Sequence, residues 1–96
     1  MVKVLLGQYR PERVVLFGSL AGGKWGRDSD IDLLIVKRTS VPFYRRMAVV
    51  RALVASARRG LPFDPIVLTP AELRNRLARG DQFVAGILAS GKVLHG

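Results

Sequence analysis

The stretch GSLAGGKWGRDSDIDLLIV, residues 18–36, decides how the rest of the chain is interpreted. It begins where an apolar run, residues 14–17, stops at Gly18 and Ser19, and it ends in a second apolar run, residues 33–36. A glycine and a serine directly after a buried strand predict a sharp bend. Free backbone N–H groups and a hydroxyl in such a bend can hold phosphate oxygens. We therefore expect a phosphate-binding bend between two buried strands.

Two carboxylates stand immediately before the second apolar run. Because side chains alternate across a strand, Asp30 and Asp32 are predicted to project from the same face, about 6.5 to 7 Å apart along it. Carboxylates at that separation can share a pair of divalent cations about 3.5 to 4 Å apart. Their mutual repulsion also favours a cation between them. A phosphate-binding bend facing such a pair suits phosphoryl or nucleotidyl transfer.

The spacing of these features carries a family resemblance. Gly18-Ser19, ten intervening residues and Asp30-x-Asp32 match the signature of the polymerase-β-like nucleotidyltransferases. The chain resembles their smallest branch, the minimal nucleotidyltransferase family, over about residues 14–68. The resemblance implies that Asp30 and Asp32 bind two Mg²⁺ ions and that Gly18 and Ser19 hold the triphosphate of ATP.

A third carboxylate is expected from a neighbouring strand. Asp64 is the only other acid inside an apolar strand, residues 63–68. The resemblance makes it a ligand of the metal that activates the attacking hydroxyl, and a candidate general base for that hydroxyl. The alternative is that Asp64 is a turn residue before Pro65, since Asp-Pro is a frequent turn dipeptide.

The glycine-rich loop between the two strands holds further candidates. Lys24 and Arg27 either neutralise the triphosphate or are solvated loop charges. Trp25 is expected to pack over the core as an aromatic lid, and stacking on a nucleobase is the alternative. The family usually has arginines at the positions of Leu20 and Gly22, so this chain departs from the pattern there.

Hydrophobic periodicity predicts an α/β (α+β) fold, with a small mixed sheet flanked by helices. We expect the helices to cover one face of the sheet and the active site to lie at the ends of the first three strands. The expected strands are residues 13–17, 31–37, 63–68 and 92–95. The expected helices are residues 2–9, 42–59, a segment from a Thr69 cap to Gly80, and one from an Asp81 cap to Gly91. Together they form a single domain, residues 1–96.

Three details of the elements can be anticipated. After Arg13 the first strand is continuously apolar, which predicts burial on both of its faces. Pro65 has no N–H to donate, so the third strand is predicted to lie at an edge of the sheet or to be bulged. The last helix is expected to bury Phe83, Val84, Ile87 and Leu88.

Composition narrows the class of protein. The chain has 96 residues, 49% of them hydrophobic, with no cysteine and a formal net charge of +9 at pH 7. Such a length and hydrophobic content indicate one folded domain. No apolar run is long enough for a membrane span, and no signal peptide is recognisable, so we expect a cytoplasmic protein. The positive charge suits nucleotides, nucleic acids or an acidic protein as partners. The alternative is an arginine-rich proteome, because the arginines are scattered through several elements and do not form one run.

The acceptor of the nucleotide is expected on another molecule. Minimal nucleotidyltransferases commonly pair with an all-helical HEPN ribonuclease toxin. The resemblance implies an antitoxin that transfers AMP from ATP to a tyrosine of that toxin. Two alternatives stay open. One is a binding module that covers its partner or binds nucleic acid, and the other is an enzyme that modifies a small molecule.

Overall fold

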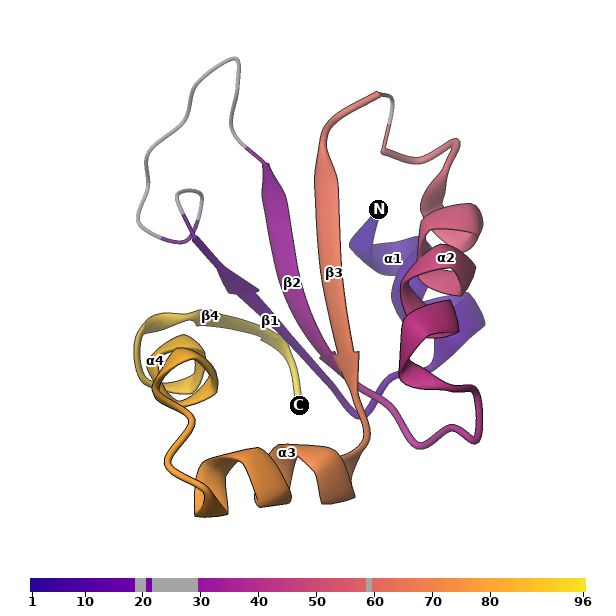
Figure 1. Ribbon diagram of the computed structural model, residues 1–96. Helices are drawn as coiled ribbons and strands as arrows, with labels where there is room; N and C mark the ends of the chain where they lie inside the picture. The colour runs from indigo at the N-terminus through magenta and orange to yellow at the C-terminus, as the bar shows by residue number, and fades with distance from the viewer. Residues whose placement is uncertain (19–20, 22–29, 59) are drawn as a thin grey trace.

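The computed structural model describes residues 1–18, 21, 30–58 and 60–96. Within these residues, four strands form one mixed sheet with helices packed against it, as expected (Figure 1). The strands are β1 (Arg13–Phe17), β2 (Ile31–Val36), β3 (Phe63–Leu68) and β4 (Lys92–His95). The helices are α1 (Val2–Val4), the π-helical segment η1 (Leu5–Tyr9), α2 (Phe43–Val54), α3 (Pro70–Ala78) and α4 (Gln82–Ser90). None of the helices described is both long and apolar enough to cross a membrane.

The sheet has the strand order β3-β2-β1-β4. Strand β1 is antiparallel to both of its neighbours, whereas β2 and β3 run parallel. The N-terminal ends of β2 and β3 therefore lie at the same end of the sheet as the C-terminal end of β1. Strand β3 lies at an edge, as Pro65 predicts, because an edge strand needs hydrogen-bond donors on one side only.

Both faces of the sheet are covered, so the expectation of helices on one face was wrong. Val14 packs in a cluster with residues of η1 and α2, and the adjacent Val15 packs in a second cluster with residues of α3 and α4. Neither valine is exposed, which confirms burial on both faces of β1. Consecutive residues of the central strands are apolar, and they point to opposite faces. Each face therefore needs its own helical layer.

Two helical segments differ from the expected ones: the first, over residues 2–9, in its type, and α2 in where it ends. The first helical segment is short and passes into a π-helical turn before Arg10, which has a left-handed backbone at φ 53°. Helix α2 ends at Val54, not at residue 59, and a turn follows over residues 55–58. Ala55 and Ser56 are exposed, whereas Ala57 and Arg58 are half-buried. Gly60 then adopts a φ of +77°, the usual way for glycine to end such a segment.

The caps of the last two helices are those expected from the sequence. The Glu72 N–H donates to Thr69 Oγ1 at 3.1 Å, and the Thr69 N–H donates to Glu72 Oε1 at 2.8 Å, which is a reciprocal capping box. The Val84 N–H donates to Asp81 Oδ1 at 3.0 Å and so caps α4. These bonds occupy backbone donors that the first turn of a helix otherwise leaves unpaired.

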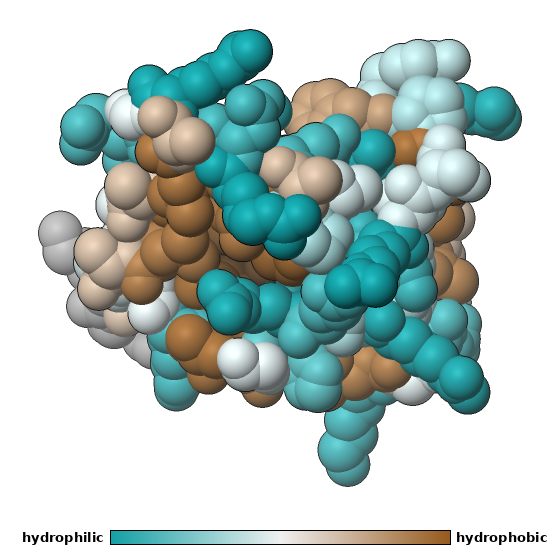
Figure 2. All heavy atoms as spheres, turned by 90° about the horizontal axis from the view of Figure 1, so that it is seen from below, coloured by the Kyte–Doolittle hydropathy of each residue, from teal (hydrophilic) through white to brown (hydrophobic). Residues whose placement is uncertain are grey.

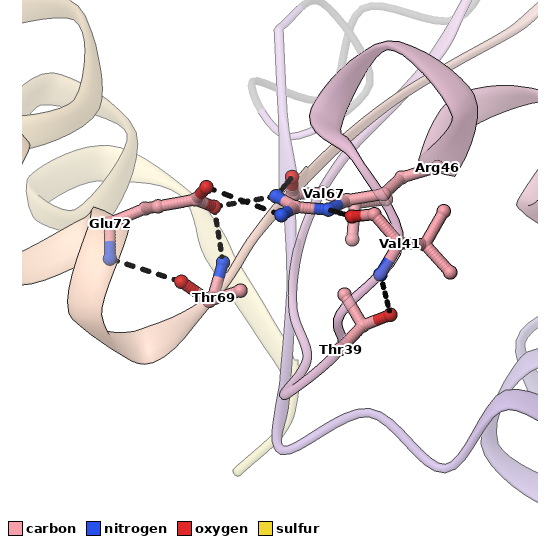
Figure 3. Close-up of polar contacts among 6 residues, drawn as sticks. All are labelled: Thr39, Val41, Arg46, Val67, Thr69 and Glu72. Atoms are coloured by element: carbon pink, nitrogen blue, oxygen red, sulfur yellow. Dashed lines mark hydrogen bonds and ion pairs between the residues drawn. The ribbon is translucent and has the colours of Figure 1, made fainter.

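One ion pair connects the two helical layers. Among the described residues, Arg46 of α2 is the one buried charged side chain. Its Nε donates to the Val41 carbonyl at 2.8 Å, and Nη1 donates to the Val67 carbonyl at 3.2 Å (Figure 3). Both terminal nitrogens also bond the Glu72 carboxylate of α3, at 2.5 and 3.2 Å. The hydrogen bonds from Arg46, more than any other influence, hold the pKa of Glu72 below its usual value.

Candidate active site

The pairing of β2 with β3 brings three carboxylates together. In the parallel register Asp32 lies directly beside Asp64, and Asp30 comes immediately before β2. One carboxylate oxygen from each of the three residues lies within 4.8 Å of the others. The acids lie at the N-terminal ends of two adjacent strands, so the backbone of the sheet sets their separation.

Gly18 lies at the same end of the sheet as the acids, directly after the C-terminal end of β1. Phe17 is paired with Asp32 across the antiparallel strands, so the next residue lies beside the Asp32 carboxylate. Gly18 has a φ of +77°, and a Cβ built on it would overlap Asp32 Oδ2. Glycine is therefore required here twice, for its left-handed backbone and for the close approach of that backbone to the acid.

The carboxylates repel one another. The pKa of Asp32 is raised above its ordinary value, first by burial and then by the negative charges of Asp64 and Asp30. In the described part of the chain, the ion pair that reaches this cluster joins Arg51 Nη2 of α2 to Asp64 Oδ1 at 3.2 Å. Asp64 is the most open of the acids, with 61% of its side chain exposed.

This arrangement fits divalent cations. Carboxylate oxygens are the ligands that Mg²⁺ prefers, and a positive ion between the acids would offset the repulsion among their charges. Asp30, Asp32 and Asp64 are the residues that would hold such ions. Asp64 is a strand residue inside β3 and not a turn residue, which removes the alternative interpretation of its position.

Several residues named from the sequence lie outside the described part of the chain. They include the proposed phosphate ligands Ser19, Lys24 and Arg27, and also Trp25. Their roles stay predictions.

Sequence reasoning did not single out Arg51 at the acid cluster. It lies 13 residues before Asp64. It also donates from Nε to the Phe63 carbonyl at 3.4 Å. The sequence does not distinguish such an arginine, on the exposed face of a helix, from an ordinary solvated charge. Only the packing of α2 beside the edge strand reveals this contact.

Two of the cavities lined by described residues lie away from the acids. At the C-terminal ends of β2 and β3, one cavity of about 320 Å³ is lined in part by Arg38 and Arg74. An adjacent cavity of about 310 Å³ is lined in part by Arg13, Val36 and Arg74. Seen from below, the molecule shows apolar residues in a hollow bordered by hydrophilic side chains (Figure 2). No carboxylate of the cluster lines either cavity, so neither belongs to the candidate active site.

Comparisons with known proteins agree with this geometry. The model of the nucleotidyltransferase domain family matches residues 2–87. No curated protein matches the chain. A solved structure described as "Crystal structure of the toxin-antitoxin with AMP-PNP" is similar in fold, with a TM-score of 0.68 and 25% sequence identity. That similarity covers 99% of this chain and 69% of the other. With its polymerase-β-like sheet and a family match over most of its length, the chain belongs to the nucleotidyltransferase domain family.

Proposed function

We propose that this protein is a Mg²⁺-dependent nucleotidyltransferase that transfers AMP from ATP to a hydroxyl group of a protein partner. The proposed partner is a HEPN-family toxin, the acceptor is one of its tyrosines, and the chain acts as the antitoxin. The observation that carries the proposal is the convergence of Asp30, Asp32 and Asp64 within 4.8 Å, beside Gly18. The likeness to a solved toxin-antitoxin structure supports the partner class.

The exposure of the three acids suggests how they divide the work. Asp30 and Asp32 are partly buried, whereas Asp64 is largely exposed at the sheet edge. An incoming hydroxyl therefore reaches Asp64 first, which suits this residue to accept the hydroxyl proton. Bound Mg²⁺ would supply positive charge that stabilises the phosphate oxygens and makes the hydroxyl more acidic.

The proposed reaction is a single displacement at the α-phosphorus. The acceptor oxygen forms a bond to that phosphorus while the bond to the bridging oxygen of the β-phosphate breaks. Pyrophosphate leaves with the bonding electrons, and the proton of the hydroxyl passes to the Asp64 carboxylate. Gly18 and the following serine would hold the phosphates in line, because a glycine has no side chain to keep an anion away from the backbone N–H groups of the bend.

The charge of the chain agrees with a protein acceptor. A net charge of +9 favours association with an acidic surface and would speed the encounter with one. It would also attract nucleic acid, which is the basis of the rival interpretation as a binding module.

The test is transfer of radiolabelled AMP from ATP to a helical protein encoded beside this chain. We expect label on the partner with the wild type and at least a hundredfold less with Asp32→Asn or Asp64→Asn. Glu12→Gln is the matched control, because it also replaces a carboxylate by an amide but in an exposed pair with Arg38.

Two results would argue against the proposal. One is an unlabelled partner although both proteins are folded and Mg²⁺ and ATP are present. The other is that Asp32→Asn, assayed without nucleotide, neutralises the toxin as efficiently as the wild type does. The second result would favour a binding module that acts by covering its partner.

A further inference from the structure

The two cavities at the C-terminal ends of β2 and β3 are adjacent, because Pro70 and Arg74 line both of them. Their volumes, about 320 and 310 Å³, are near the lower limit for sites that bind organic ligands. On β2, Val36 at this end is four residues after Asp32 at the other, which separates the cavities from the acids by about 13 Å along the strand. We call the surface formed by both cavities the basic groove, and define it by Arg13, Val36, Arg38, Pro70, Leu73 and Arg74.

The basic groove combines an apolar floor with a charged rim. Val36 and Leu73 line it and are almost fully buried, with 4% and 8% of their surfaces exposed. Arg13 lies beside Val36, because these residues are paired between β1 and β2, and Arg74 follows Leu73 on α3. Both arginines are exposed. This face of the molecule shows an apolar hollow bordered by hydrophilic side chains (Figure 2). A ligand in the groove would therefore meet apolar surface and positive charge together.

The arginines of the rim differ in whether a carboxylate already balances their charge. Arg38 Nε lies 2.9 Å from the Oε1 atom of Glu12, the one acid among the described lining residues, so these two charges offset each other. Among the described residues, no carboxylate forms an ion pair with Arg13 or Arg74. A charged group at the edge of an apolar floor favours a ligand of opposite charge. The groove therefore fits an anionic ligand with an apolar part.

The wall formed by α3 is in place before any ligand binds. Arg46 bonds the Val67 carbonyl of β3 and the Glu72 carboxylate of α3, which ties the first turn of the helix to the sheet. The capping box at Thr69 already occupies the Glu72 N–H, and Pro70 has no N–H. The arginines, and not the end of the helix, therefore supply most of the positive charge. A preformed wall lowers the entropic cost of binding.

We propose that the basic groove binds an acidic peptide segment of a protein partner, with an apolar side chain of that segment on the floor and its carboxylates at Arg13 and Arg74. The planar guanidinium group suits this role, because it can bond a carboxylate through two parallel N–H donors. The inference goes beyond the proposed function, because binding here needs neither ATP nor a metal ion. It also leaves the acids at the opposite end of β2 accessible.

Nucleic acid is the other class of anion that a basic surface can attract. Proteins bind single strands largely through aromatic side chains that stack on the bases. None of the described residues that line the groove is aromatic. Phe83, which is 57% exposed although the apolar stripe of α4 predicts its burial, lines a different cavity beside Gly18. A phosphodiester backbone also has no apolar group to cover Val36 and Leu73. The groove therefore fits an acidic peptide better than a nucleic acid.

The test measures the fluorescence anisotropy of labelled ligands with the full chain, in EDTA and without nucleotide. One peptide has a leucine between two pairs of glutamates, a second has glycine in place of the leucine, and a single-stranded RNA of equal charge is the third ligand. We expect the leucine peptide to bind about tenfold more tightly than the glycine peptide, as for one buried leucine side chain. Arg13→Ala and Arg74→Ala should each weaken its binding about tenfold, a loss typical of an arginine that anchors an interface.

Arg79→Ala is the matched control, because it removes another exposed arginine, at the far end of α3 and outside both cavities. It should change the affinity by less than about twofold. An equal loss in Arg79→Ala and Arg74→Ala would overturn the inference, because binding would then follow net charge alone. Equal affinity for the two peptides, or no binding of either, would overturn it as well.

The RNA distinguishes the two classes of anion. RNA that binds more tightly than the leucine peptide, and is weakened by Arg74→Ala, would assign the groove to nucleic acid and overturn the peptide site. Because these measurements contain no nucleotide and no free Mg²⁺, their outcome is independent of AMP transfer. The groove and the proposed function can therefore fail separately.

Discussion

Replacing Asp32 by asparagine should make the metal-free protein more stable while abolishing transfer. The pKa of Asp32 is raised by burial and by two neighbouring carboxylates. A raised pKa means that the folded protein binds the proton more tightly than the unfolded chain does. The ionised acid therefore costs stability above its folded-state pKa, and this cost disappears as the pH falls below the ordinary value of 3.8.

The size of the effect follows from the separation of the charges. Two unit charges 4.8 Å apart repel by about 0.9 kcal/mol in water, and by more where water is partly excluded. Asparagine has nearly the same shape as aspartate and removes both repulsions, so we expect a gain of about 2 kcal/mol at pH 7.5. For a domain of this size, that gain raises the melting temperature by about 10 °C.

Thermal melts in EDTA and in Mg²⁺ would test this reasoning. In EDTA the advantage of Asp32→Asn should shrink as the pH is lowered from 7.5 toward 4, because the wild-type acid then takes up its proton. At a Mg²⁺ concentration ten times the dissociation constant, the wild type should gain about 1.4 kcal/mol and the variant less. The control Glu12→Gln should keep the wild-type response to Mg²⁺.

Two results would refute the argument. A lower melting temperature for Asp32→Asn than for the wild type, in EDTA at pH 7.5, would show that the acids do not repel one another in the folded protein. Equal stabilisation of both proteins by Mg²⁺ would show that the ion is held elsewhere.

Three further predictions follow from named contacts. Arg46→Met should destabilise the fold by about 3 kcal/mol in urea denaturation, because it breaks a partly buried ion pair and leaves two carbonyls without their donor, whereas the exposed Arg74→Met should change stability by less than about 0.5 kcal/mol. The pKa of Glu72 is lower in the folded protein than in the unfolded chain, so the ionised carboxylate stabilises the fold. This stability is fully present above the unfolded-state pKa and is lost as the pH falls through the lower folded-state pKa. Urea midpoints measured between pH 6 and 3 should therefore fall more for the wild type than for Glu72→Gln. Gly18→Ala should lower the free energy of unfolding by about 1 to 2 kcal/mol, because alanine disfavours the left-handed backbone, and should displace the Asp32 carboxylate. Thermal melts should therefore show a lower melting temperature and a smaller stabilisation by Mg²⁺. An unchanged stabilisation by Mg²⁺ would contradict the close contact between Gly18 and Asp32.

Features of the fold and of the candidate site that depend on residues close together in the chain can be predicted from the sequence alone. The capping box at Thr69 and the cap at Asp81 depend on residues three apart, so their helices begin where expected. Asp30 and Asp32 alternate with apolar residues of one strand, and this alone places them on one face. The central strands β1 and β2 are recognisable because runs of apolar residues fill both of their faces.

The tertiary structure decided the rest, because those features depend on which elements become neighbours. Asp64 meets Asp32 only through the parallel register of β2 and β3, whose residues are 32 positions apart in the chain. Arg46 has the sequence pattern of a surface charge. It is buried because α2 packs at the edge strand and because α3, in the opposite layer, places Glu72 beside it. The second helical layer and the exposure of Phe83 likewise arise from how α4 approaches the end of β1. Periodicity reports which side of a helix is apolar, but it contains no information on how far the facing sheet extends to cover it.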